Sequence, residues 1–173
     1  MGIEIDRTRF SPGDYQAFQQ RLEENLDALY QLADDPGFAR GPGSLGAELE
    51  MYLVDANGRP LYANREVLEQ ASDPQLTLEL NRYNLEFNLS PYALSEAPFT
   101  STENEILTKV SGLGKVAAKF GGRVVPIGIL PSLREAGCGS HCSSDRRRSH
   151  ALVAQVRQRR GGRFQIESLS RRH

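Results

Sequence analysis

The chain has 173 residues, of which 39% are hydrophobic and 25% are charged, a composition typical of one globular domain with a substantial core. It contains no run of about 18 or more apolar residues, so we expect no membrane span. The N-terminus lacks the basic and apolar regions of a signal peptide, so we expect a cytoplasmic protein in which disulfides are disfavoured.

Charge is distributed unevenly along the chain. Residues 134–173 hold ten arginines and three acidic residues, net +7, which leaves 11 basic and 19 acidic residues, net −8, in residues 1–133. Phe164 is the only aromatic residue of the basic segment, which therefore has little with which to build a core. We predict an acidic body over residues 1–133, and an arginine-rich tail over residues 134–173 that is poorly ordered or a truncated continuation.

The first predicted element is an amphipathic helix. Ser11 suits an N-cap, Pro12 the first helical position and Asp14 the capping-box position, and residues 35–37 (Asp-Pro-Gly) end the pattern. Apolar residues then recur at spacings of three and four: Tyr15, Phe18, Leu22, Leu26, Leu29 and Tyr30. We expect this stripe to contact the core rather than a cofactor.

Strict alternation predicts a strand over residues 44–54. One face is apolar: Leu45, Ala47, Leu49, Met51 and Leu53. The other face carries Glu48 and Glu50 two residues apart, with Cβ atoms roughly 6.5–7 Å from each other. Because like charges repel, this face needs a metal ion, a basic side chain or solvent against it, and alternation does not choose among the three.

Turn and cap residues outline the next elements. Asn57-Gly58 predicts a tight turn, and Asn64 an N-cap for a short helix over residues 65–71. Alternation over residues 76–89 changes phase at residues 81–83, which predicts two strands with a tight link or a bulge. The second strand has a polar face, Asn84, Glu86 and Asn88, that suits solvent and a functional site equally.

A second helix is expected after Thr100, which suits an N-cap. Its apolar stripe runs from Ile106 to Phe120, and Gly121-Gly122 closes it. Residues 123–131 form an apolar run of strand length, in which Pro126 is best tolerated at a sheet edge or a bulge.

The glutamates of these strands are the main candidate for chemistry. If the strands pair in one antiparallel sheet, Glu48, Glu50, Glu86 and Glu79 converge on one face. Hard oxygen ligands suit magnesium or manganese, which commonly bridge nucleotide phosphates. Ordinary surface glutamates with no ligand are the alternative.

The tail offers weaker signals. Cys138, His141, Cys142 and His150 lack the paired spacing of structural zinc sites. Arginines 146–148, with Arg157, Arg159, Arg160 and Arg163, lack aromatic interleaving, so we expect a solvated basic segment and rank nucleic-acid binding by the tail last among the hypotheses. The sequence contains neither a phosphate-binding GxxxxGK[ST] loop nor a GxGxxG motif after a strand.

Three segments together resemble a known family. Residues 44–55 (SLGAELEMYLVD), 85–91 (LEFNLSP) and 122–129 (GRVVPIGI) resemble the N-terminal part of the glutamate–cysteine ligase type 2 family, ATP-dependent carboxylate–amine ligases related in fold to glutamine synthetase. The order of predicted elements also agrees. The resemblance covers residues 3–133 and fades in the tail, and members of the family are considerably longer.

The resemblance implies an α+β fold in which a curled antiparallel sheet, half of a glutamine-synthetase-like funnel, is flanked by helices. It implies Mg²⁺ and ATP as cofactors, and amide-bond formation between small-molecule carboxylate and amine substrates through an acyl phosphate. The implied metal ligands are Glu48, Glu50 and Glu86, with Glu79 as a weaker candidate. Asn84 and Asn88 are the implied cofactor- or substrate-facing groups.

A second hypothesis is a non-catalytic, truncated homologue that acts as an assembly or interaction protein. The later strands of the family, which supply further ligands, have no counterpart in this chain. An incomplete sheet leaves unpaired edges and apolar surface, which favour association with a second copy or with a longer paralogue.

Overall fold

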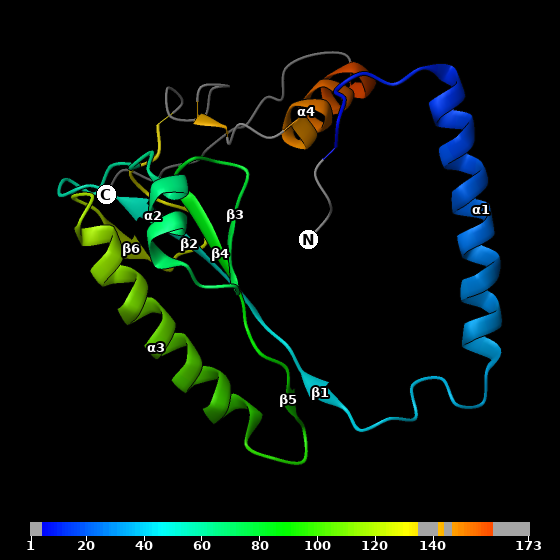
Figure 1. The fold of residues 1–173 in the computed structure, drawn as a ribbon, viewed down its shortest axis with the longest axis horizontal. Helices are drawn as coiled ribbons and strands as arrows, with labels where there is room; N and C mark the ends of the chain where they lie inside the picture. Colours follow the sequence, from blue (N-terminus) through cyan, green and yellow to red (C-terminus); the bar gives the residue numbers. More distant parts are fainter. Residues whose placement is uncertain (1–4, 135–141, 144–146, 161–173) are drawn as a thin grey trace, which may run out of the picture. The chain divides into compact units, whose positions relative to one another are not determined.

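The computed structural model describes residues 5–134, 142–143 and 147–160, without the side chains of residues 149 and 157–160. Contacts divide the chain into two units, Asn25–Ser144 and the pair of segments Met1–Glu24 and Asp145–His173. Within the described residues the fold is α+β, with four α-helices and two antiparallel sheets (Figure 1). None of the described helices combines the length and apolar character that a membrane crossing requires.

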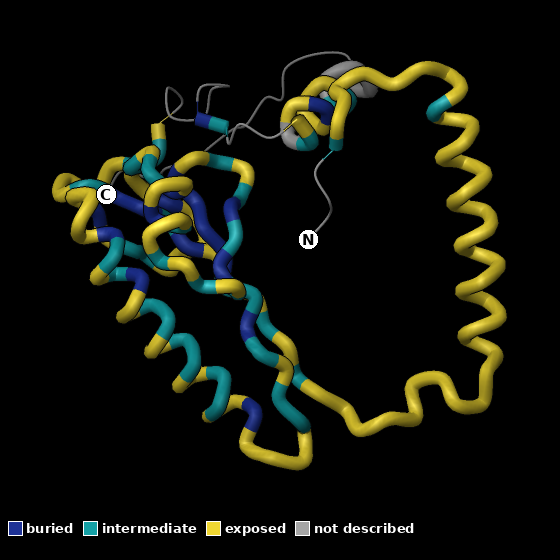
Figure 2. The backbone as a smooth tube through the Cα atoms, viewed as in Figure 1, coloured by how far each residue is buried: buried dark blue, intermediate teal, exposed yellow. Residues whose placement is uncertain are grey.

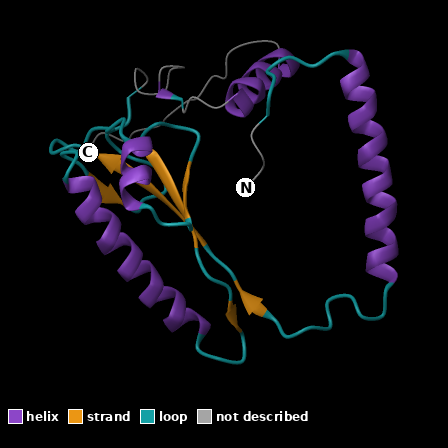
Figure 3. Ribbon diagram, viewed as in Figure 1, coloured by secondary structure: helices purple, strands orange, loops and turns teal. Residues whose placement is uncertain are grey.

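The unit Asn25–Ser144 contains both sheets (Figure 3). The larger has the strand order β3-β4-β2-β6, and every neighbouring pair is antiparallel. Its strands are β3 Leu76–Leu78, β4 Asn84–Asn88, β2 Glu48–Val54 and β6 Arg123–Val125. The smaller sheet pairs β1 Ser44–Leu45 with β5 Tyr92–Ala93.

The sequence predicted the strands only in part. The strand β5 was not predicted, and the run of strand length over residues 123–131 is a strand only over Arg123–Val125. The phase change is confirmed, because β3 and β4 form a hairpin linked through residues 79–83. The single strand expected over residues 44–54 is wrong, since it is interrupted at Gly46 and Ala47 and its two pieces belong to different sheets. Alternation continues through the break and therefore cannot reveal it.

The core lies on the apolar face of the larger sheet, beneath α2 Asn64–Ala71 and α3 Pro98–Ala118. Leu85 and Phe87 of β4 are buried at its centre. Helical residues of the same cluster include Val67 of α2 and Leu113 and Ala117 of α3. Buried backbone is concentrated here in Figure 2. Burying one such large side chain contributes roughly 1.5–3 kcal/mol, so this cluster accounts for much of the unit's stability.

The predicted turn and the predicted helix end are both confirmed. Asp55 Oδ1 accepts hydrogen bonds from the backbone N–H groups of Asn57 and Arg59, and Gly58 has the positive φ that the turn requires, 72°. At the end of α3, Gly121 has φ 74° and the Gly122 N–H donates to the Ala117 carbonyl. Both glycines therefore occupy positions where the backbone geometry explains the residue type.

Two predicted helix caps are wrong. Asn64 is the first residue of α2, and its buried side chain donates instead to the carbonyls of Asn81 and Asn84, at 3.0 and 3.1 Å. Thr100 lies inside α3, which begins two residues earlier because Pro98 fixes a helical φ at the start. A residue type that is common at helix N-caps is therefore not at the N-cap in either helix.

The other unit contains α4 Arg147–Arg160 and the first half of α1 Pro12–Asp34. The predicted capping box is confirmed, since Asp14 Oδ2 accepts from the N–H and the hydroxyl of Ser11 at 2.8 and 2.7 Å. The Arg147 guanidinium donates to the Asp6 carbonyl at 2.8 Å. Part of the basic tail is therefore helical, while residues 135–141, 144–146 and 161–173 lie outside the described residues.

The expected core role of the α1 stripe is wrong. Not one residue of α1 is buried, and in Figure 2 the helix is exposed along nearly all of its length. Phe18 and Tyr30 are 67% and 69% exposed. Periodicity predicted the helix and its apolar face correctly, but not what covers that face.

A short segment from beyond residue 134 is attached to the β3–β4 link. The Arg82 N–H donates to the Cys142 carbonyl at 2.8 Å, and Asn81 forms a β-bridge with Ser143. Cys142 carries a fully buried thiol that lies 3.4 Å from the hydroxyl of Tyr62. We call residues 142–143 the strap.

Candidate functional site

The polar face of the larger sheet positions the candidate residues. Antiparallel register places Glu50 of β2 opposite Glu86 of β4, and Thr77 of β3 opposite Glu86 on its other side. One step along the same face, Glu48 lies opposite Asn88. The predicted convergence of carboxylates on one face is therefore confirmed for β2 and β4.

Three carboxylates meet closely enough to share a cation. Oxygen atoms of Glu50, Glu79 and Glu86 all lie within 4.8 Å of one another. Glu79 follows directly after β3, which places its side chain beside Glu86. Glu50 is exposed, Glu79 half-buried and Glu86 buried, so the cluster leads from the surface into the sheet. We call these three residues the acid cluster.

Glu86 carries the unusual electrostatics of the acid cluster. It is only 4% exposed, and its Oε1 atom has no hydrogen-bond partner among the described residues. Burial, then the hydrogen bond and the charge of Glu79, then the charges of Glu48 and Glu50 raise the pKa of Glu86 to about 7. At neutral pH the cluster therefore requires a proton or a cation to offset its charge.

Burial also decides a question that the sequence left open. Asn84 and Glu86 are both buried although they point to the polar face of β4, so this part of the face is not an ordinary solvated surface. Glu48 and Glu50 on β2 are exposed. The polar face thus changes from exposed on β2 to enclosed on β4.

The other predicted site residues lie beside the acid cluster or serve the fold. Glu48 and Asn88 border an open pocket of about 490 Å³ that Pro91 also lines. Asn84 is committed to the fold, because its amide donates to the Met51 carbonyl and its oxygen accepts from Asn81. Of the four predicted ligands, Glu50, Glu79 and Glu86 thus lie together, and Glu48 lies one step away along the same face.

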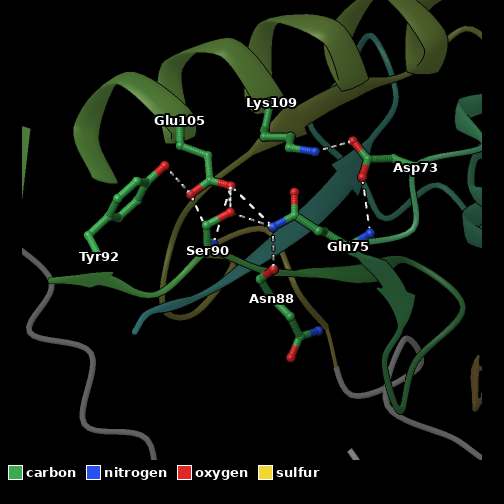
Figure 4. Close-up of polar contacts among 7 residues, drawn as sticks. All are labelled: Asp73, Gln75, Asn88, Ser90, Tyr92, Glu105 and Lys109. Carbon is green, nitrogen blue, oxygen red and sulfur yellow. Dashed lines mark hydrogen bonds and ion pairs between the residues drawn. The ribbon is translucent and has the colours of Figure 1, made fainter. Parts of the chain in front are cut away.

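A second polar cluster, centred on Glu105 of α3, was not predicted (Figure 4). Its carboxylate accepts hydrogen bonds from the N–H and hydroxyl of Ser90, the amide of Gln75 and the hydroxyl of Tyr92. Burial tends to raise the pKa of Glu105, but the hydrogen bonds from Ser90 and Gln75 outweigh it, and the net pKa is lowered. Because the donor residues lie 13 to 30 positions before Glu105 in the sequence, no local pattern signals this cluster.

Neighbouring contacts continue this network toward the start of β3. The Gln75 amide also donates to the Asn88 carbonyl, and the Lys109 ammonium of α3 pairs with Asp73. Asp73 also accepts from the backbone N–H of Gln75. These contacts join α3 to both strands of the hairpin, which makes the network a structural clamp rather than a second reactive site.

The weaker signals of the tail are only partly described. Cys138, His141 and Arg146 lie outside the described residues, whereas Cys142 belongs to the strap and the exposed His150 to α4. The structure thus brings no zinc ligand set together within the described part of the chain.

Comparison with known proteins adds no assignment: no protein-family model, no curated protein and no solved structure matches this chain.

Proposed function

We propose that the acid cluster binds Mg²⁺ and that the protein is an ATP-dependent carboxylate–amine ligase of the glutamate–cysteine ligase type, or a partial active site of one. The observation that carries this proposal is the buried Glu86 carboxyl, which lies close to the carboxylates of Glu50 and Glu79 and whose Oε1 atom has no hydrogen-bond partner among the described residues. The resemblance of residues 3–133 to the ligase family is the basis for proposing ATP as the nucleotide and amide-bond formation as the reaction.

The donor set fits a hard divalent cation. All three side chains offer carboxylate oxygens, which Mg²⁺ and Mn²⁺ prefer over the softer ligands of zinc sites. They project from two neighbouring strands and the residue after a third, so the hydrogen-bonded hairpin fixes their spacing. When bound, the ion would supply positive charge against nucleotide phosphates.

The competing explanation is a proton shared between Glu86 and Glu79. Two carboxyls at this distance favour retaining one proton, and that would equally account for the raised pKa of Glu86. The two explanations differ in one respect: a cation releases the proton of Glu86 on binding, whereas a shared proton requires no ion. Proton release on metal addition therefore separates them.

The open pocket beside Glu48 and Asn88 is the place we assign to the substrates. It adjoins the acid cluster along the same face, since Glu48 precedes Glu50 by two residues on β2. In this assignment the Glu48 carboxylate would accept hydrogen bonds from the amine substrate. The Asn88 side-chain amide would donate a hydrogen bond to the carboxylate substrate. In this proposal the larger sheet is the curled half of a funnel, and a longer homologue or a second copy would complete it.

Calorimetric titration with Mn²⁺ and Mg²⁺ in two buffers of different ionisation enthalpy tests metal binding and proton release together. We expect binding at pH 7 with release of a fraction of a proton. Glu86→Gln and Glu50→Gln should weaken binding by about tenfold or more, whereas Glu69→Gln on the exposed face of α2 should not change it. Absence of binding heat in the wild type would overturn the proposal.

Nucleotide and reaction are tested separately. With saturating Mg²⁺, ATP should bind to the wild type and not to Glu86→Gln, and phosphate release should depend on an added carboxylate and an added amine. If Mg²⁺ and ATP bind but no amide forms, the chain is a partial active site. If metal binds and ATP does not, the ligase assignment fails while the metal site remains.

A further inference from the structure

One member of the acid cluster lies outside the strands of the sheet. Glu50 and Glu86 lie inside β2 and β4, where they are paired with each other in antiparallel register. Glu79 instead begins the β3–β4 link, residues 79–83. The sheet therefore fixes the positions of two carboxylates of the cluster, while the position of the third depends on the conformation of the link.

The strap holds this link from the side of the C-terminal region. The Ser143 hydroxyl donates to the Leu80 carbonyl at 3.4 Å, and the backbone of Ser143 forms the β-bridge to the link described above. The Arg82 N–H donates to the Cys142 carbonyl at 2.8 Å. The strap thus contacts the residues that follow Glu79 directly. All of these residues belong to one unit of the chain, Asn25–Ser144.

Leu80 joins the strap to the acid cluster. Its N–H donates to Glu79 Oε2 at 3.2 Å, and its carbonyl accepts the hydroxyl of Ser143. One residue therefore contacts the ligand on one side and the strap on the other. Groups that hydrogen-bond to a metal ligand orient it, and their loss typically weakens metal binding about 10–100-fold.

The side chain of Cys142 anchors the strap. It is fully buried, and its thiol lies 3.4 Å from the hydroxyl of Tyr62. The ring of Tyr62 packs edge-on against the buried ring of Tyr83 in the link, with centroids 5.7 Å apart. A charged side chain at position 142 would have to lose its hydration to stay in this place, so it should release the strap. A small apolar side chain can stay.

We propose that the strap positions Glu79 for metal binding, so that docking of the strap and binding of a divalent cation by the acid cluster strengthen each other. This inference rests on the proposed metal binding by the cluster. Coupling of this kind is reciprocal: the factor by which the docked strap tightens metal binding equals the factor by which the metal tightens docking. Any event that draws residues 142–143 away from the link therefore lowers the affinity for metal.

Calorimetric titration of the full chain with Mn²⁺ provides the first test. Cys142→Asp and Cys142→Lys should each weaken binding about tenfold, and Cys142→Ala less than about twofold. The two charged variants control for each other, because an effect of the added charge on the bound cation would have opposite signs. Opposite changes in affinity would contradict the proposal.

A double-mutant cycle separates positioning of Glu79 from a general loosening of the fold. In a Glu79→Gln background, Cys142→Asp should change the affinity for Mn²⁺ less than about twofold, because the ligand that the strap positions is already absent. In a Glu50→Gln background, the same substitution should retain its effect of about tenfold. Equal effects in the two backgrounds would show that the strap does not act through Glu79.

The reciprocal effect is measured without a charged substitution. In a Cys138→Ser variant, Cys142 is the one remaining thiol of the chain. Because this thiol is buried, it reacts with N-ethylmaleimide when the strap opens. Saturating Mg²⁺ should slow the reaction about tenfold, the factor found by titration, and should not slow it when Glu86→Gln is added. A rate that Mg²⁺ leaves unchanged overturns the proposal.

The outcomes distinguish this inference from the proposed function. If the wild type binds Mn²⁺ and the charged variants bind it equally tightly with unchanged far-ultraviolet circular dichroism, the role of the strap is refuted and the metal site stands. If the wild type binds no Mn²⁺, both fail. If the charged variants do not fold, the rate of the thiol reaction with and without Mg²⁺ decides.

Discussion

Glu105 of α3 receives both the backbone N–H and the hydroxyl of Ser90, at 3.1 and 2.9 Å, immediately after the chain leaves β4. One carboxylate thereby holds the end of a central strand against a helix that covers the core. The same carboxylate holds Tyr92 of the smaller sheet, so the two sheets of this unit share an anchor.

Glu105→Ala should lower the free energy of unfolding of the unit Asn25–Ser144 by about 2–4 kcal/mol, because it leaves several donors without an acceptor. Chemical denaturation followed by circular dichroism measures the change. Glu103→Ala, at an exposed position two residues earlier, serves as the control and should change stability by less than about 0.5 kcal/mol. Equal losses in both variants would contradict the clamp.

In metal-free buffer, the acid cluster should make the free energy of unfolding decrease as pH rises. The pKa of Glu86 is about 7 in the fold against a reference of 4.5, so its contribution is fully present below pH 4.5 and is lost as pH rises through 7. The loss amounts to about 3 kcal/mol at most. Denaturation at pH 5.5 and pH 8 should show this slope in the wild type and in Glu69→Gln, and Glu86→Gln should remove it.

Asn64→Ala should lower the free energy of unfolding by about 2–3 kcal/mol, since it removes the two hydrogen bonds that the buried Asn64 amide donates to the carbonyls of Asn81 and Asn84. If Asn64 acted as an N-cap, Asn64→Ala would lower the free energy of unfolding by only about 1 kcal/mol, and Asn64→Ser would retain the wild-type stability. Thermal and urea denaturation of both variants distinguish the roles: in the structure as described, serine is too short to replace the amide and should be nearly as destabilising as alanine.

Leu85→Ala should be among the most destabilising truncations of the sheet, at about 3–4 kcal/mol, because the side chain is fully buried at the centre of the core. The same truncation at Leu80, which is half-exposed at the hairpin end, should cost less than about 1 kcal/mol. A comparable midpoint of urea denaturation for the two variants would show that the core is elsewhere.

Local patterns predicted the local structure of this protein well. The capping box at Ser11 and Asp14, the turn at Gly58 and the phase change before Asn84 each depend on neighbours within a few residues, and all three appear in the structure. The alternating face of residues 48–54 also predicted which β2 side chains point to the core.

Features that depend on distant parts of the chain were predicted less well. The inclusion of Glu79 in the acid cluster depends on hairpin register, which alternation does not specify. The clamp of Glu105 joins segments up to 30 residues apart, and the role of Asn64 depends on residues 17 and 20 positions away. The exposure of α1 depends on what the helix meets, about which its own periodicity says nothing.

The strap divides the arginine-rich region into two parts with different tolerance to shortening. A chain cut after residue 133 would retain every strand of the larger sheet but would lose the Cys142 carbonyl that accepts from Arg82, and would uncover the phenol of Tyr62. A chain cut after Ser143 would retain both contacts. When the chain is shortened step by step from its C-terminus, the first loss of stability should therefore appear when the strap is removed. The strap lies about ten residues beyond residue 133, where the sequence suggests that the body ends.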